Sequence, residues 1–421
     1  MNTPSLKLRR TSKKILLLVL ILDTCVFNLH AQLGPEITSW ILNNTGATGY
    51  AGIPSNIQQV QYSTANVYVS ASCIPGYDIG PWQGNPNIPA NQNFVYKITR
   101  TPQHNTGNAV NTPLGHIGVW TNGVSIFNAK DANSYMNQGV WNQNAIVVEG
   151  ASFDSCLGHP APNGEYHHHL NPRCLYDDAD SMHHSPIIGY AFDGFPIYGA
   201  YGYADSTGTS LTIKRMSSSY HSRTMSVRDT LPDGTLASSA GPNVSGTYPI
   251  GYYCEDFKYI SHSGNLDSHN GRWCVTPDYP AGTYAYFVTI DATLTATYPY
   301  TLGLTYYGTV PAGNTGPGGG HNTITESVTT YTSVNEVAPK VDFNLYPNPT
   351  ADFVSLYVNP TTENNFTINV YNISSELIYT QNNIQPAVQY SFDFTDLPEG
   401  MYLIRITGNG FSAMKKVTVL R

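Results

Sequence analysis

Apolar and polar residues alternate along several short segments of this chain, and this two-residue period is typical of β-strands that bury one face. The run from 57 to 71 shows the alternation around Val60, Tyr62, Val67 and Val69. Asn122 and Gly123 separate two further strands and predict a tight hairpin, because a type I′ turn needs positive φ at both central positions. The remaining strands of this part are predicted at 94–99, 116–121, 124–127, 145–149, 165–170, 251–260, 282–291 and 300–307.

Helical signals are scarce, and the pattern predicts one short helix from Asp131 to Met136 with Asp131 as its N-cap. From 309 to 340 the composition changes to glycine, proline, threonine, serine and asparagine, which is typical of a linker. Seven short strands separated by turns follow it, and they predict a small Ig-like β-sandwich. These strands are predicted at 343–346, 354–358, 366–371, 377–380, 390–394, 400–407 and 413–420.

The fold class is therefore predicted to be mostly β, with a large irregular β domain with long loops followed by a small seven-stranded sandwich. The predicted boundaries are a signal peptide at 1–32, the large domain at 33–308, the linker at 309–340 and the C-terminal domain at 341–421. The signal peptide is indicated by an apolar run at 15–22 that is too short to span a bilayer. Five cations precede this run: Lys7, Arg9, Arg10, Lys13 and Lys14.

Composition and charge narrow the classes of partner. The 421 residues contain 20 Lys and Arg and 28 Asp and Glu, for a formal net charge of −8. Removal of residues 1–32, with five cations and one acidic residue, leaves 15 against 27 and a net charge of −12. Such an acidic chain is a poor partner for nucleic acid. No later segment is apolar enough to cross a membrane, so the mature protein is predicted to be soluble or attached to a surface.

Five cysteines follow the predicted signal peptide, and export to an oxidising compartment favours disulfides. The near pairs are Cys156 with Cys174 and Cys254 with Cys274, and each would close a loop worth about 3 kcal/mol. Cys73 is then left over. Spacing alone does not fix the connectivity.

The C-terminal segment closely resembles the sorting domain of cargo proteins of the type IX secretion system. The motifs that carry the resemblance are 345–350 (LYPNPT), 398–406 (PEGMYLIRI) and 415–421 (KKVTVLR), in this order at the end of the chain. The resemblance implies contact of residues 341–421 with the type IX secretion machinery and transport through the periplasm of a Gram-negative bacterium. It also implies removal of the domain and a secreted or cell-surface location for the part that precedes it.

Histidines are concentrated in one stretch, since six of the thirteen lie between His159 and His184. Imidazole is the side chain that proteins most often use for metal ligation and proton transfer. Alternate residues of a strand share a face, so His167 and His169 are predicted to point together, while Tyr166 and His168 point the other way. Two imidazoles at this spacing can bind one metal ion.

Further ligands must come from other segments. The nitrogen candidates are His159, His184 and His269, and the oxygen candidates are Asp154, Asp193, Glu255 and Asp256. Tyr166, Asp193 and Glu255 are candidates for the partners that orient the ligands. Imidazole ligation favours copper or zinc as the cofactor. The competing interpretation is that the histidine pair is only a polar part of a strand surface.

The segment 156–202 resembles the YHYH domain, which is named after a Tyr-His-Tyr-His motif. The resemblance is carried by Gly158, His159 and Pro160, by 166–169 (YHHH) and by 184–199 (HSPIIGYAFDGFPIYG), and weaker similarity extends it to about 60–308. The chain departs from the motif at His168, where the family has its second tyrosine. The family has no assigned chemistry, so the metal site is predicted from the residues and not from the resemblance.

Two other functions compete with metal binding. The protein could be a non-catalytic adhesion module for glycans or surface proteins, with Trp82, Trp120, Trp141 and Trp273 as candidates for stacking. It could also be a hydrolase that uses Asp193 or Glu255 as a general base. Convergence of the imidazoles at one point would separate the metal hypothesis from both.

Overall fold

The structure is a computed structural model that describes residues 5–7, 33–316, 318–332, 343–359, 365–374, 376–408 and 411–421. The described residues form two compact units, one of residues 33–332 and one of residues 343–421 together with 5–7. Apart from Ser5–Lys7, the predicted signal peptide at 1–32 lies outside the described residues, as does 333–340 of the predicted linker. The mostly β fold class is confirmed.

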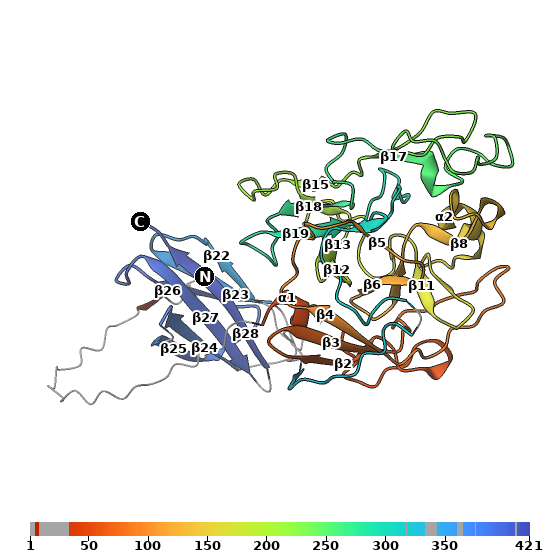
Figure 1. Cartoon of the computed structure of the whole chain (residues 1–421). Coiled ribbons are helices and arrows are strands. Elements are labelled where there is room, and N and C mark those ends of the chain that lie inside the picture. The colour runs from red at the N-terminus through yellow and green to blue at the C-terminus, as the bar shows by residue number, and fades with distance from the viewer. Residues whose placement is uncertain are drawn as a thin grey trace. The chain divides into compact units, whose positions relative to one another are not determined.

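The larger unit is built on a mixed eight-stranded sheet (Figure 1). All residues are buried in the four central strands, as expected for strands that are covered on both faces: His116–Trp120, Ile187–Ala191, Pro196–Tyr198 and Thr283–Phe287. The strand order is β10 (His159–Pro160), β11 (Tyr166–His168), β7 (Ser125–Phe127), β6 (His116–Trp120), β12 (Ile187–Ala191), β13 (Pro196–Tyr198), β19 (Thr283–Phe287) and β18 (Gly271–Cys274).

A four-stranded antiparallel sheet shares its core with the eight-stranded sheet. Its order is β21 (Thr329–Tyr331), β2 (Ile57–Tyr62), β3 (Asn66–Ala71) and β4 (Phe94–Thr99). Val60 and Val69 of this sheet belong to the same buried cluster as Val119 and Tyr190 of the larger sheet. The alternation of apolar and polar residues at 57–71 therefore reflects a sheet that buries one face in this core.

Short elements and loops make up the rest of the larger unit. The two-stranded pairs are β5 (Val110–Asn111) with β20 (Thr305–Tyr306), β8 (Lys130–Ser134) with β9 (Asn142–Asn144), β14 (Tyr201–Tyr203) with β15 (Ile213–Arg215) and β16 (Tyr220–Ser222) with β17 (Phe257–Tyr259). The helices are α1 (Pro35–Thr38) and α2 (Ala145–Glu149), with 3-10 turns at Tyr50–Gly52, Tyr135–Asn137, Gly150–Ser152 and Cys254–Asp256.

The smaller unit is a sandwich of two four-stranded sheets, and all seven strands predicted after 341 occur in it. One sheet has the order β1 (Ser5–Lys7), β26 (Gln389–Asp393), β23 (Phe353–Val358) and β22 (Phe343–Tyr346). The other has the order β25 (Leu377–Ile384), β24 (Phe366–Asn372), β27 (Gly400–Gly408) and β28 (Phe411–Val419). Leu356 and Phe392 from the first sheet pack with Ile368 and Ile404 from the second in one buried cluster.

Two local predictions in the larger unit are wrong. Residues 131–136 form part of strand β8 and a 3-10 turn instead of a helix, because the Asp131 carboxylate accepts hydrogen bonds from the backbone and side chain of Asn133. Residues 145–149 form helix α2 instead of a strand. The side chain of Asn144 accepts a hydrogen bond from the N–H of Ile146 and caps this helix.

The predicted hairpin at Asn122 and Gly123 is present between β6 and β7. Its turn differs from the predicted type, because Gly123 has a φ of +83° and Asn122 has no positive φ.

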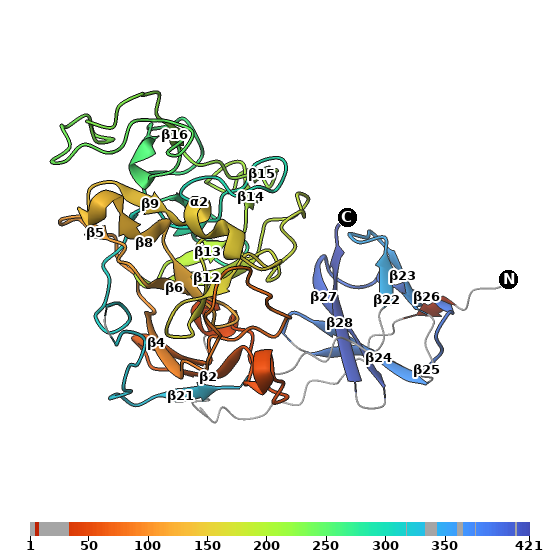
Figure 2. The ribbon, with the colours of Figure 1, turned by 90° about the vertical axis from the view of Figure 1, so that its right-hand side faces the viewer.

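The predicted linker also needs correction over its first part. Strand β21 pairs with β2, and Figure 2 shows it along that edge of the sheet. The side chain of Asn314 exchanges hydrogen bonds with the backbone of Lys97, and Glu326 accepts hydrogen bonds from Asn66 and Tyr68 (both 2.7 Å). Residues 309–316 and 318–332 are thus part of the larger unit, held by polar contacts that composition does not reveal.

Candidate metal centre

A hairpin at one edge of the eight-stranded sheet brings two histidines together. His159 in β10 is the cross-strand partner of His167 in β11. In the tight turn between the strands, Gly164 donates its N–H to the carbonyl of Ala161 (2.8 Å) and adopts a φ of +82°, a conformation that favours glycine. The Nε2 atoms of His159 and His167 are 3.1 Å apart.

The alternation of side chains along β11 continues through the next residue, His169, and separates the three histidines into two groups. His167 and His169 point to the same place, with their Nε2 atoms 3.2 Å apart. His168 points the other way and is fully buried against the rings of Tyr166 and Trp120. Burial lowers the pKa of His168 to about 4, so this ring is neutral at pH 7.

Glu149, the last residue of α2, is the fourth member of the group. Its Oε2 lies 3.1 Å from Nε2 of His159 and 3.3 Å from Nε2 of His169. Sequence reasoning missed this residue because 145–149 was predicted as a strand, which gave no reason to place its carboxylate near the histidines. An asparagine cap at position 144 was the signal that could have indicated a helix there.

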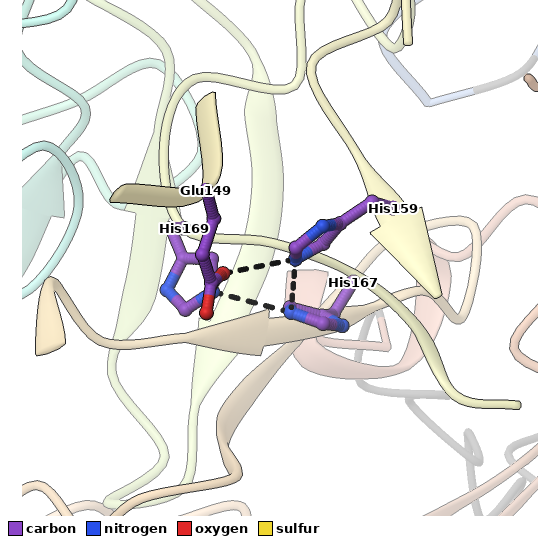
Figure 3. A group of neighbouring side chains, drawn as sticks. All are labelled: Glu149, His159, His167 and His169. Carbon is purple, nitrogen blue, oxygen red and sulfur yellow. Dashed lines mark hydrogen bonds and ion pairs between the residues drawn. The ribbon is translucent and has the colours of Figure 1, made fainter. Parts of the chain in front are cut away.

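The four ligand atoms form a closed group that can hold a metal ion (Figure 3). Neighbouring atoms around the group are separated by 3.1, 3.2, 3.3 and 3.1 Å, and all four lie within 4.8 Å of one another. The three histidines are buried, with exposed fractions of 3 to 6%. We call Glu149, His159, His167 and His169 the metal cluster.

Each imidazole of the metal cluster is oriented through its other ring nitrogen. Nδ1 of His167 donates to the carbonyl of Glu165 (3.0 Å), and Nδ1 of His169 donates to the carbonyl of Asn128 (2.6 Å). Carbonyl oxygens only accept, so both rings carry a proton on Nδ1, and a neutral ring then turns an Nε2 lone pair inward.

His159 has a hydroxyl partner. Its Nδ1 lies 2.8 Å from Oγ of Ser152, which donates its own proton to the carbonyl of Glu149 (2.8 Å). The hydroxyl therefore accepts from Nδ1 of His159 and ties two members of the metal cluster together. Histidines that bind metals are typically oriented by such outer partners.

Electrostatics keep the metal cluster ready to accept a cation. Burial, followed by the neighbouring imidazoles, lowers the pKa of His167 well below its usual value. Burial opposes ionisation of Glu149, but His159, His169 and Asp131 more than offset it and hold the pKa of this carboxyl well below its usual value. Burial and a hydrogen bond with Glu149 raise the pKa of Asp131. A neutral imidazole and a carboxylate are the forms that bind metals.

Aromatic rings cover the histidines, and a cavity opens beside them. Phe127 stacks on His167 at 3.8 Å between ring centroids, and Phe153 packs against His159 and His169. A cavity of about 600 Å³ is lined by all four members of the metal cluster. The arrangement can therefore hold an ion in a site that is dry on one side and accessible on the other.

Two of the predicted nitrogen ligands, His184 and His269, lie outside the metal cluster. His184 donates from Nδ1 to the carbonyl of Ser185 (2.8 Å) and packs between Tyr198 and Tyr203. His269 lies 3.1 Å from the carbonyl and 2.9 Å from the hydroxyl of Thr305. Closeness in sequence to His169 did not place His184 near it in space.

The predicted oxygen ligands and outer partners also lie outside the metal cluster and make contacts elsewhere. Tyr166 donates to Oδ2 of Asp154 (2.9 Å), whose carboxylate also holds the N–H groups of Cys156 and Gly158, so this pair fixes the loop before His159. Glu255 binds the backbone and side chain of Asn142 (both 2.7 Å) next to α2.

Asp193 and Asp256 are buried carboxylates with local partners. Asp193 accepts from the hydroxyl of Tyr286 (2.6 Å) and from the N–H of Gly308 (2.8 Å). Asp256 forms a buried ion pair with Arg228, with two contacts of 2.7 Å. Neither carboxylate, nor that of Glu255, lines the cavity at the metal cluster.

One of the two predicted disulfides is present. Cys156 and Cys174 are bonded, which confirms that pair. Cys254 and Cys274 are free and buried, and the predicted bond between them is wrong. Cys254 belongs to a small cluster with Leu170 and Tyr298, whereas Cys274 belongs to the main core. Cys73 is also free, with its thiol 3.0 Å from the carbonyl of Tyr166.

The candidate stacking residues are mostly structural. Trp120 and Trp141 are 0% and 1% exposed, and the indole N–H of Trp82 donates to Asp154. Trp273 is exposed to 60%. One exposed indole among four gives no aromatic platform, so the burial of these residues does not favour the adhesion alternative.

The fold and the site define a β-sheet protein that carries a buried histidine and carboxylate cluster, joined to a separate small sandwich. Residues 95–299 match the family model for YHYH protein, and residues 344–420 match the model for a secretion system C-terminal sorting domain. The chain thus carries a YHYH domain and ends in a type IX sorting domain, as the sequence motifs predicted. No match was found among curated proteins.

The sorting domain identifies the chain as cargo of type IX secretion, with an extracellular or cell-surface location. Within the described residues, no helix has both the length and the apolar character needed to cross a membrane.

Proposed function

We propose that this exported protein binds one divalent transition-metal ion through Glu149, His159, His167 and His169. The observation that carries the proposal is the convergence of four acceptor atoms on one point, 3.1 to 3.3 Å between neighbours. The smaller unit serves export, and the metal site belongs to the larger unit.

The ring protons support this proposal. Because His167 and His169 hold their protons on Nδ1, their Nε2 atoms face each other as two acceptors at 3.2 Å when both rings are neutral. The carboxylate of Glu149 adds a third acceptor to the same place. Acceptors crowded in this way repel one another, and a cation between them removes the repulsion.

Protonation of the histidines is the alternative to binding an ion, and it is costly in free energy. To satisfy all four contacts without an ion, His159 and His169 would both have to carry a second proton on Nε2. Two imidazolium charges would then share a site where the histidines are at most 6% exposed, with one carboxylate between them. Burial of charge without full compensation is expensive, whereas one divalent ion places the same charge where all four ligands reach it.

The spacing suits a transition metal. Four donors at 2.0 to 2.1 Å from one ion in a tetrahedral arrangement lie about 3.3 Å from one another. The four distances between neighbouring atoms of the metal cluster are close to this value, and the other two are within 4.8 Å. Three imidazole nitrogens and one carboxylate oxygen favour zinc or copper over magnesium or calcium, which prefer oxygen. When bound, such an ion supplies Lewis acidity or, if it is copper, redox chemistry.

Metal analysis of protein purified without an affinity tag tests the proposal. Wild type is expected to take up one equivalent of zinc or copper after dialysis against chelator and reloading. His167→Gln and His169→Gln are expected to lose it. His184→Gln and His269→Gln are matched controls that remove histidines outside the metal cluster and should retain the full equivalent. A folded, metal-free wild type after reloading would refute the proposal.

A further inference from the structure

The cavity beside the metal cluster has the dimensions of a ligand site. Its volume of about 600 Å³ falls in the range of roughly 300–1,000 Å³ that is usual for small-molecule pockets. Structural metal sites are closed by protein ligands on every side, whereas sites that act on a substrate keep an accessible position. All four cluster residues line this cavity.

Access to the metal cluster is uneven. The side chains of His159 and His169 are 7% and 4% exposed, while that of Glu149 is 25% exposed. Phe127 and Phe153 cover the imidazole rings. A molecule in the cavity therefore meets the bound ion from the side of Glu149.

The cavity walls are rich in apolar groups. Those that carry the argument are Pro86, Leu114, Phe127, Val148, Pro160 and Pro162. Leu114 is 53% exposed, so its side chain is accessible to a molecule in the cavity. These groups can bury an apolar body of moderate size.

Most polar side chains of the wall already have protein partners. The amides of Asn85 and Asn87 donate to the carbonyl of Pro160 (2.9 and 3.3 Å), and the hydroxyl of Ser152 is bound to Glu149 and His159. Lys130 and Asp131 add one positive and one negative charge, which cancel. The walls therefore offer apolar contact more than polar recognition.

We propose that this cavity binds a molecule with an apolar body that gives one oxygen or nitrogen atom to the bound ion. The inference rests on the proposed metal function and deepens it, because it makes the centre a ligand-accepting site instead of a structural one.

Cobalt(II)-loaded protein provides the test, since its visible spectrum responds to a new ligand on the ion. The probes are imidazole and 4-phenylimidazole, which share a donor and differ by one apolar ring. Both are expected to change the spectrum with saturation, and 4-phenylimidazole is expected to bind about tenfold more tightly because its phenyl ring is buried against the walls. Equal affinity of the two probes would overturn the apolar part of the proposal.

Two variants that fill the cavity locate the probe. Ala132→Trp and Ala151→Trp change exposed alanines of the cavity wall, and Ala240→Trp changes an exposed alanine that does not line it. The first two should keep one equivalent of cobalt and weaken 4-phenylimidazole by about tenfold or more, and the third should leave its affinity unchanged. If the spectrum of the cobalt-loaded protein did not change with either probe, this inference would be overturned and the proposal of metal binding would stand. Failure to load cobalt would overturn both.

Discussion

The metal cluster and the surroundings of Asp193 show two ways in which this protein buries titratable groups. Around Asp193, each acceptor meets a donor: Tyr286 donates its hydroxyl to Oδ2, and Gly308 and Phe195 donate their N–H groups. In the metal cluster, His167 and His169 already donate from Nδ1 to backbone carbonyls, so their inward Nε2 atoms are both acceptors when the rings are neutral.

The difference shows why the direction of lone pairs decides function here, more than the number of histidines or carboxylates. Asp193 is fully buried, and its hydrogen-bond donors satisfy the carboxylate without an ion. Under our proposal, Glu149 and its three imidazoles reach the same kind of satisfaction when they bind a cation. The predictions below test that distinction.

The largest expected effect concerns Asp193, whose carboxylate is satisfied by donors from the protein. Burial raises the pKa of Asp193 to about 6, above the value of 3.8 expected in the unfolded chain, although Tyr286 and two N–H groups oppose the shift. The folded state then binds more protons between these values, so stability falls as pH rises from about 4 to about 6, by about 3 kcal/mol.

Urea unfolding of metal-free protein across this pH range measures the effect. Asp193→Asn should flatten the dependence in the pH 4 to 6 window and leave metal affinity unchanged. An unaltered slope in the variant would show that Asp193 is already ionised at low pH in the folded state.

The second prediction concerns the carboxylate of the metal cluster. Glu149→Gln should weaken zinc by about a hundredfold, or about 2.7 kcal/mol, because the neutral amide loses both a charge and a strong ligand. Isothermal titration calorimetry measures the change, with Asp193→Asn as the carboxylate control. Equal affinities in Glu149→Gln and wild type would remove Glu149 from the site.

The smallest expected effect concerns two hydroxyls that contact imidazoles, one at the metal cluster and one at His269, which lies outside it. Ser152→Ala removes the partner of His159 and should weaken zinc about tenfold, as is typical for the loss of an outer partner. Thr305→Val removes the comparable contact to His269 and should not change zinc affinity. If both variants weakened zinc alike, the effect would reflect general stability.

Much of the fold could be predicted from the sequence, because alternation reports which face of a strand is buried. The seven sandwich strands after residue 341 and the strands at 57–71 follow from it. The short apolar run at 145–149 did not, since a few apolar residues fit a helix or a strand equally and only the cap at Asn144 decides. The paths of 309–316 and 318–332 depend on side-chain contacts such as those of Asn314, which hydrophobic periodicity does not predict.

The site was predicted in part for the same reason. The shared face of His167 and His169 is a local consequence of strand geometry, and the opposite direction of His168 follows with it. The position of His159 depends on the pairing register between β10 and β11, and the position of Glu149 depends on where helix α2 ends. Sequence spacing therefore did not separate His159 from His184 and His269, and it left Glu149 out.

X-ray absorption spectroscopy of the zinc-loaded protein tests the central claim most directly. We predict one ion per chain with a first shell of nitrogen and oxygen at about 2.0 to 2.1 Å and the outer-shell scattering of three imidazole rings. Sulfur scattering at about 2.3 Å, or the signal of a single imidazole, would contradict the assignment of the ion to Glu149, His159, His167 and His169.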